Sequence, residues 1–180
     1  NRLKMIAVKP TLYKGYYFRS KNEAKWAVFF DKLGIPYQYE PEAFMCSDGS
    51  QYTPDFFLPN SYLRDIRWKG LYLEVKHKEW THQEDIGYTY RISTALPNNP
   101  LVLLCGDPYD IVHGNGENNN EQLCPWWDNY MVLMYCGKCR VLKTDYDEGN
   151  YCNCPLCGGD IMNVSKEAEY ARQYRFVYTN

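Results

Sequence analysis

The chain has 180 residues, and 45% of them are apolar, which suits one medium-sized domain with a buried core and a small appendage. No apolar run reaches the ~18 residues that cross a membrane, so we expect no membrane-spanning segment. The net charge is −2, but residues 1–39 carry eight Lys or Arg against two acids, a charge of +6, which leaves −8 for the remainder.

The basic N-terminal segment predicts an edge of the protein that contacts the phosphates of a nucleic acid. A solvated, lysine-rich surface explains the same charge equally well. Because the chain starts at Asn1 rather than Met, we expect residues to precede it. The candidate nucleic-acid-binding residues are Lys14, Arg19, Lys21 and Lys25.

The first predicted element is an amphipathic helix at residues 20–33. Ser20 can cap its first turn, and Gly34 stands where a helix typically ends. Four apolar residues recur at the spacing that places them on one helix face, namely Trp26, Phe29, Phe30 and Leu33.

Strand-like segments follow the helix at residues 37–44, 52–58 and 71–76. A second, weaker helix is predicted at 82–96, and the apolar run at 101–105 predicts a strand buried on both faces. This αβββαβ order predicts an α/β fold with a mixed sheet flanked by helices, in which the second helix crosses over to a parallel strand.

Residues 113–123 are rich in Gly and Asn and predict a linker or mobile loop. We therefore expect a first domain at residues 1–112 and a small cysteine-containing module at residues 124–180.

Acidic and basic residues with catalytic potential lie in the strand-like segments. Glu74 and Lys76 share one face of a strand because side chains alternate, and Val75 between them points the other way. Their separation of about 6.6 Å suits a carboxylate that holds a divalent metal and an ammonium beside the same phosphate. Asp55 on a neighbouring strand supplies a second hard oxygen ligand of the kind that Mg²⁺ prefers. The alternative is a chance arrangement on an exposed strand edge.

With the helix motif Arg19-Ser20-x-x-Glu23-Ala24, these segments resemble the PD-(D/E)XK nucleases of phages and mobile elements. The resemblance covers residues 12–106 and implies a restriction-endonuclease-like fold. It also implies Mg²⁺ or Mn²⁺ dependence and hydrolysis of phosphodiester bonds in DNA. The motifs that carry it are Tyr39-Glu40-Pro41-Glu42, Tyr52-Thr53-Pro54-Asp55-Phe56 and Glu74-Val75-Lys76.

The resemblance also implies a role for each residue of the catalytic site. Asp55 and Glu74 would bind the metal together with the carbonyl of Val75. Lys76 would orient or activate the attacking water and stabilise the developing negative charge. Glu23 matches a helix glutamate that some members use for a second metal. Its position three residues after Ser20 is explained equally well by a capping box.

Two Cys-x-x-Cys turns predict a tetrahedral Zn²⁺ site in a zinc ribbon, which the segment resembles. A closed site of this kind is structural and can dock DNA or a protein partner. A pair of disulfides and an iron–sulfur cluster are the alternatives, and Cys152 can replace Cys154 as a ligand. The four predicted ligands are Cys136, Cys139, Cys154 and Cys157.

The sequence thus predicts a metal-dependent DNA endonuclease. Its cysteine spacing favours a reducing compartment, the cytoplasm of a bacterial or phage-infected cell. One alternative is a non-catalytic zinc module that binds nucleic acid or protein on a degenerate nuclease fold. A further alternative is a nuclease for branched or single-stranded DNA or for RNA.

Overall fold

The computed structural model describes residues 10–63, 69–77, 101–113, 132–145, 153–154 and 156–178. The predicted helix at 82–96, most of the predicted linker, and Cys152 lie outside the described residues. The predicted division into two domains stays a prediction. None of the helices in the described part of the chain is long and apolar enough to cross a membrane.

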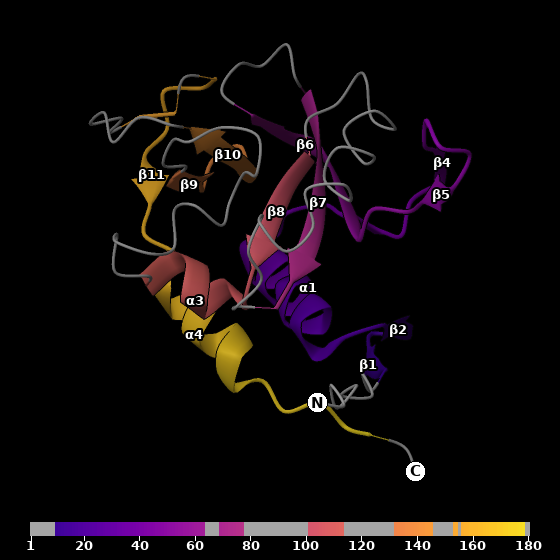
Figure 1. The fold of residues 1–180 in the computed structure, drawn as a ribbon. Helices are drawn as coiled ribbons and strands as arrows, with labels where there is room; N and C mark the ends of the chain where they lie inside the picture. Colours follow the sequence, from indigo (N-terminus) through magenta and orange to yellow (C-terminus); the bar gives the residue numbers. More distant parts are fainter. Residues whose placement is uncertain are drawn as a thin grey trace.

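A mixed sheet flanked by helices forms the centre of the fold, as the sequence predicts (Figure 1). Strands β6 and β7 are antiparallel, whereas β8 runs parallel to β7 and β10 runs parallel to β6. The strand order is β11-β9-β10-β6-β7-β8, and β3 also pairs with β6. The bounds are β3 Gln38–Tyr39, β6 Phe56–Leu63, β7 Lys69–Lys76, β8 Leu101–Cys105, β9 Val132–Cys136, β10 Val141–Asp145 and β11 Ile161–Met162.

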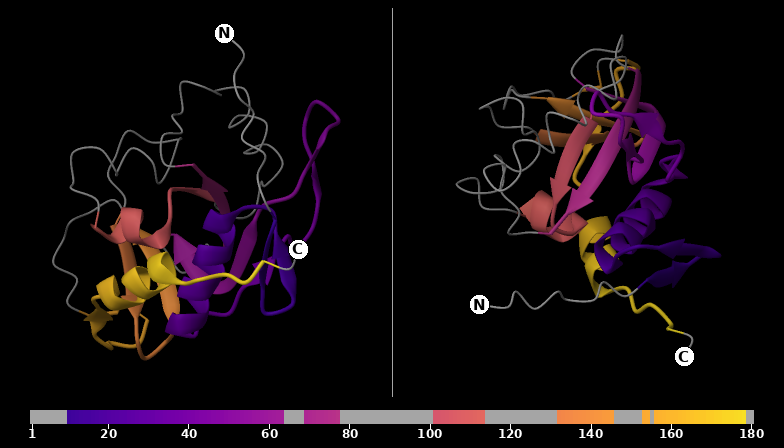
Figure 2. Two further views of the ribbon diagram at one scale, coloured as in Figure 1. Left: turned by 90° about the horizontal axis from the view of Figure 1, so that it is seen from below. Right: turned by 45° about the vertical axis from the view of Figure 1, so that its right-hand side comes forward.

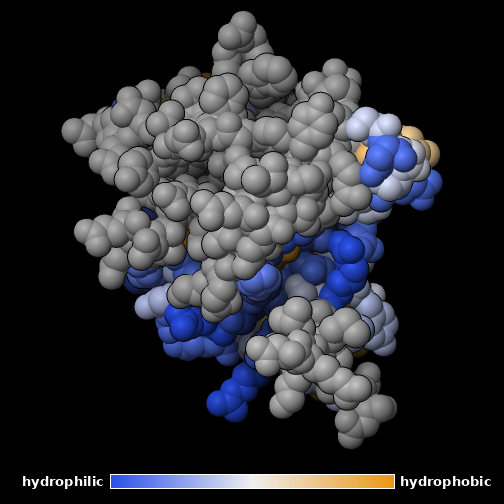
Figure 3. Space-filling model, in the orientation of Figure 1, coloured by the Kyte–Doolittle hydropathy of each residue, from blue (hydrophilic) through white to orange (hydrophobic). Residues whose placement is uncertain are grey.

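Two hairpins flank this sheet. Strand β1 (Thr11–Tyr13) pairs with β2 (Tyr16–Phe18), and this hairpin projects beside the first helix in the right-hand view of Figure 2. Strand β4 (Phe44–Met45) pairs with β5 (Gln51–Tyr52). The second hairpin bears a hydrophobic spot on an otherwise largely hydrophilic described surface (Figure 3), and Met45 is 62% exposed.

The β4–β5 hairpin takes up the ends of two segments that the sequence predicts as continuous strands. The segment 37–44 breaks after Tyr39, because Glu40 adopts a left-handed φ of 46° and Pro41 follows it. The segment 52–58 is interrupted at residues 53–55, where Pro54 has no N–H to donate to a strand ladder. This interruption places Asp55 immediately before β6 instead of within it.

Helix α1 (Lys21–Leu33) begins and ends where the sequence predicts. The Ser20 Oγ accepts a hydrogen bond from Glu23 N at 3.2 Å, which satisfies one of the free N–H groups of the first turn. At the other end Gly34 adopts a φ of 66°, a left-handed conformation that costs glycine little.

Within the described residues, two further helices are present that the sequence does not predict, α3 (Pro108–His113) and α4 (Ser165–Gln173). Helix α4 buries only Ala168 and Ala171, so its apolar stripe is too weak to be recognised from periodicity.

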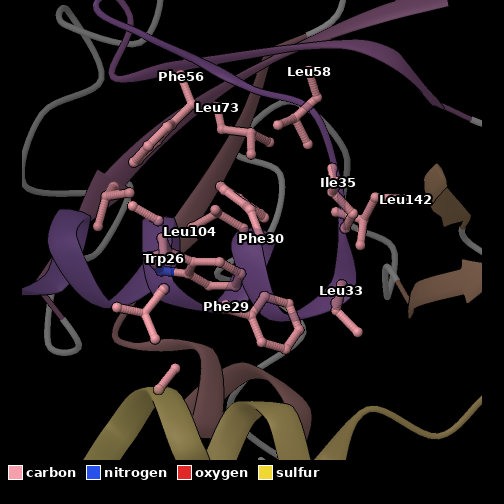
Figure 4. Packing of buried hydrophobic residues seen from close by; sticks show 14 of the residues in the cluster. Trp26, Phe29, Phe30, Leu33, Ile35, Phe56, Leu58, Leu73, Leu104 and Leu142 are labelled. Atoms are coloured by element: carbon pink, nitrogen blue, oxygen red, sulfur yellow. The ribbon is translucent and has the colours of Figure 1, made fainter. Parts of the chain in front are cut away.

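The core lies around α1, which sits between the sheet and α4 (Figure 4). Its aromatic stripe is fully buried, with Trp26, Phe29 and Phe30 each 0% exposed. Leu142 of β10 belongs to the same cluster, and the Tyr135 hydroxyl of β9 donates a hydrogen bond to the carbonyl at the end of α1. The strands beside the cysteines therefore share the core of the sheet and α1.

Candidate functional site

Three buried acids approach one another beside the central strands. Asp55 precedes β6, Glu74 lies in β7 and Glu23 lies in the first turn of α1; they are 2%, 5% and 6% exposed. The β6–β7 register pairs Phe56 with Leu73, which brings Asp55 beside the end of β7 that carries Glu74. The structure thus brings together the three acids that the sequence analysis selects.

Each of the four carboxylate oxygens of Asp55 and Glu74 has its own hydrogen-bonding or ionic partner. The Val75 N–H donates to Asp55 Oδ2 at 2.7 Å, and the Tyr52 hydroxyl donates to Glu74 Oε2 at 2.7 Å. Lys76 Nζ donates to Glu74 Oε1 at 2.8 Å, as expected of alternate residues on one strand face. One oxygen of each acid is therefore fixed by a neutral donor, and the other faces a cation.

Glu23 makes contacts at the start of α1 and lies close enough to Asp55 for its charge to act there. Its backbone N–H is bound by Ser20, as in a helix cap, and its side-chain Oε2 accepts from Arg19 N at 3.1 Å. The same oxygen accepts from the Tyr39 hydroxyl at 2.7 Å. The carboxylate therefore supports the chain entering α1, and its charge also acts on Asp55. A second-metal role stays a prediction.

Burial raises the pKa of Asp55 well above its usual range, and the charges of Glu74 and Glu23 raise it further. The Val75 N–H and Arg19 oppose this effect without cancelling it. The site therefore has an excess of negative charge in a poorly solvated position. Carboxylate oxygens are the hard ligands that Mg²⁺ and Mn²⁺ prefer, and binding of such an ion by these acids stays a prediction.

Arg19 is the cation that faces Asp55. Its guanidinium contacts Asp55 Oδ1, and its Nε lies 2.8 Å from Glu40 Oε1. The Arg19 side chain is 56% exposed, so it covers the buried carboxylate from the solvent side.

The other basic residues predicted to bind nucleic acid differ in their surroundings. Lys25 is part-buried in an ion pair with the buried Asp107, and Lys14 pairs with Asp31 at 2.9 Å. Lys21 is exposed at the start of α1. A phosphate contact by Lys25 would break its ion pair with a buried acid, whereas Lys21 faces solvent directly. Binding by all four basic residues stays a prediction.

The second site is a group of four cysteine sulfurs. The Sγ atoms of Cys136, Cys139, Cys154 and Cys157 all lie within 4.8 Å of one another, and none of the four forms a disulfide. The Sγ atoms of Cys136 and Cys157 are 3.7 Å apart, close to the ~3.8 Å edge of a tetrahedron of sulfurs around Zn²⁺. The group can therefore hold a metal ion such as zinc. Within the described residues, it is the one group of three or more Cys, His, Asp or Glu that is this compact.

Backbone N–H groups and glycines shape the two turns of this centre. Cys139 N donates to Cys136 Sγ and Gly159 N donates to Cys157 Sγ, both at 3.4 Å. A side chain at Gly159 would lie 3.2 Å from the Cys157 sulfur, so the turn has little room for one.

The cysteine centre is joined to β6, which the sequence analysis does not predict. Tyr62 of β6 is 2% exposed and packs among the cysteines, and the Ser61 hydroxyl accepts from Leu142 N at 3.1 Å. Burial raises the pKa of Tyr62, and Cys154 raises it further, so the hydroxyl keeps its proton beside the sulfurs. Tyr39 and Tyr52 are functional residues that the sequence does not single out, and their hydroxyls donate to Glu23 and Glu74. Their positions at the start of the Tyr-Glu-Pro-Glu and Tyr-Thr-Pro-Asp motifs are the feature that could have identified them.

We expect one zinc per chain, measured by elemental analysis, and its loss when Cys154→Ser and Cys157→Ser are combined. Because β10 pairs with β6 and Tyr62 packs on the cysteines, amide exchange should rise in β6 as well as in β9 and β10. Cys46→Ser, in the distant β4–β5 hairpin region, is the control and should keep its zinc. Bound iron, or unchanged exchange in β6 after zinc loss, would contradict this prediction.

Comparison of this chain with models of known protein families, with curated proteins and with solved structures gives no match. What the structure itself shows is a mixed α/β protein with a four-cysteine group that can hold a metal ion such as zinc.

Proposed function

We propose that this protein is a metal-dependent DNA endonuclease with a restriction-endonuclease-like fold of the PD-(D/E)XK class. The observation that supports this proposal best is the convergence of Asp55, Glu74 and Lys76 on two paired strands of a mixed sheet. The acids are buried and carry like negative charges at short range, which is costly for a structural role but useful for binding a divalent ion.

The proposed chemistry is hydrolysis of a phosphodiester bond. Asp55 and Glu74 would hold Mg²⁺ or Mn²⁺, with the Val75 carbonyl as a further oxygen ligand. When bound, the ion would act as a Lewis acid and lower the pKa of a water molecule. Lys76 already lies 2.8 Å from Glu74 Oε1, so its ammonium can orient that water and stabilise charge on the phosphate. Val75 N–H and Tyr52 keep the two acids in position.

Arg19 occupies the Asp55 oxygen that would face the metal. Metal binding at Asp55 therefore requires the guanidinium to move, and its contact with Glu40 retains it at the mouth of the site. In that position Arg19 can bind the phosphate of the substrate with two N–H groups. The cysteine centre would dock DNA or a protein partner at the other end of β6.

A non-catalytic binding module is the second candidate. The observation that favours it is that Arg19 and Lys76 each pair with one acid, so the acids already have ionic partners. In this case the cysteine centre would carry the binding function.

A cleavage assay on linear, nicked, branched and single-stranded DNA separates these candidates. We expect Mg²⁺-dependent cleavage, and a loss of about 10²-fold or more in Asp55→Asn and in Glu74→Gln, the size of losing one essential electrostatic contact. Asp48→Asn, an exposed acid in the β4–β5 turn, is the matched control and should cleave normally. Wild-type rates in both acid variants, with melting temperatures unchanged, would remove these two acids from catalysis. No cleavage of any of these DNAs by the wild type would leave the binding module as the better account.

Arg19→Gln should have opposite effects on metal binding and on cleavage. Removing the guanidinium frees Asp55 Oδ1 and leaves the acids less neutralised, so Mn²⁺ should bind more tightly in isothermal titration. Cleavage at saturating metal should fall, because the phosphate loses its contact. Lys21→Ala, an exposed cation nearby, should change neither measurement as strongly. Weaker Mn²⁺ binding together with a lower melting temperature would show that Arg19 only supports the fold.

A further inference from the structure

A groove of about 620 Å³ is lined by Tyr39 and Glu40, the first of which contacts Glu23 and the second of which contacts Arg19 beside Asp55. Its walls come from the β1–β2 hairpin, from the end of α1 with the segment that follows, and from β3 with the residues after it. The groove is unusual in combining several tyrosines with a few charged groups. The lining residues that matter here are Lys14, Tyr16, Asp31, Tyr37, Tyr39 and Glu40.

The groove shares a wall with the candidate catalytic site. Glu40 lines the groove and its Oε1 lies 2.8 Å from Arg19 Nε, while the same guanidinium contacts Asp55. Tyr39 also lines the groove, and its hydroxyl binds Glu23. A strand whose phosphate lies at the acids therefore has its neighbouring nucleotide within reach of the groove.

The groove offers aromatic faces of two kinds. Tyr37 is half-buried, and its ring is held by Phe30 and Phe56 at centroid distances of 5.6 and 5.7 Å. Tyr16 is 57% exposed on the hairpin, with its ring 6.4 Å from that of Phe18. Among the described residues, Tyr16 and Tyr37 make no ring contact with each other, so neither covers the other.

The charged groups of the groove stand in ion pairs. Lys14 Nζ lies 2.9 Å from Asp31 Oδ2, and Glu40 Oε1 lies 2.8 Å from Arg19 Nε, so a base N–H group or a phosphate would share or replace one member of these pairs. Burial, with the neighbouring Asp31 and Tyr16, raises the pKa of Tyr37, so its hydroxyl remains a hydrogen-bond donor at neutral pH.

We propose that this groove binds an unpaired nucleotide of a DNA strand beside the scissile bond. The base would stack on the ring of Tyr16 and contact Tyr37 on the opposite wall. The proposal rests on the nuclease function and narrows its substrate to DNA with a single-stranded part. In a duplex both faces of each base are covered by neighbouring base pairs, so tyrosine rings in a groove cannot stack on them. Base–aromatic stacking is available only to an unstacked nucleotide.

The test is the binding of fluorescent oligodeoxythymidine by anisotropy, in Ca²⁺ without Mg²⁺, beside a blunt duplex of equal length. Tyr16→Ala should weaken binding of the single strand about tenfold, within the usual range for one stacked base. Tyr16→Phe keeps the ring and should bind like the wild type. Tyr17→Ala is the matched control, because Tyr17 is the next residue of β2, is 65% exposed and does not line the groove.

The outcome that supports the proposal is a loss specific to Tyr16→Ala and to the single strand. Equal losses in Tyr16→Ala and Tyr17→Ala would overturn it, as would an equal loss on the blunt duplex. The measurements distinguish failure of the groove proposal from failure of the nuclease proposal. Binding that depends on Tyr16, without cleavage of any DNA, would support the groove and remove the nuclease. Cleavage that depends on Asp55 and Glu74, with no effect of Tyr16 on binding, would do the reverse.

Discussion

Strand β6 is the constraint on which both sites depend. It pairs with β7 on one side and with β3 and β10 on the other, so both of its ends are held by neighbouring strands. The residue before it, Asp55, is fixed by the N–H of Val75, and Tyr62 near its end packs among the cysteines. A shift of one residue in this pairing would turn the acid and the tyrosine to the wrong faces of the sheet.

Charge balance is the second determinant of the site. Three buried acids raise the free energy of the folded chain unless cations or hydrogen-bond donors compensate them. The protein provides compensation in two layers. The inner layer consists of neutral donors, Tyr39, Tyr52 and the Val75 N–H, and the outer layer consists of Arg19 and Lys76. The neutral donors hold the carboxylates in position, whereas another cation could take the place of the Arg19 or Lys76 side chain.

Much of this arrangement follows from local patterns in the sequence. Helix α1, the β7 and β8 strands and the four cysteines obey spacing rules that act over a few residues, so their positions are predictable. The breaks at Glu40 and Pro54 were missed because alternation alone does not reveal a turn within a polar strand.

Contacts across the fold were not predictable in the same way. The pairing of β10 with β6 joins segments some eighty residues apart, and the hydrogen bond of Leu142 N to Ser61 depends on it. The ion pair of Lys25 with Asp107 also joins distant segments. A count of positive charges along the chain cannot distinguish the part-buried, paired Lys25 from the exposed Lys21.

Helix α1 runs from the acids to the strand that leads to the cysteines. Its first turn carries Glu23 at the acids, and its last carbonyl, of Leu33, accepts from Tyr135 on the strand that leads to the cysteines. A helix of 13 residues spans roughly 20 Å as a nearly rigid rod. Under the proposed function both centres bind metal, and thermodynamic linkage is reciprocal, so any preference of the acids for a metal-loaded cysteine centre would return as an equal preference of the cysteines for metal-loaded acids. Helix α1 and strand β6 are the two elements that run between these centres.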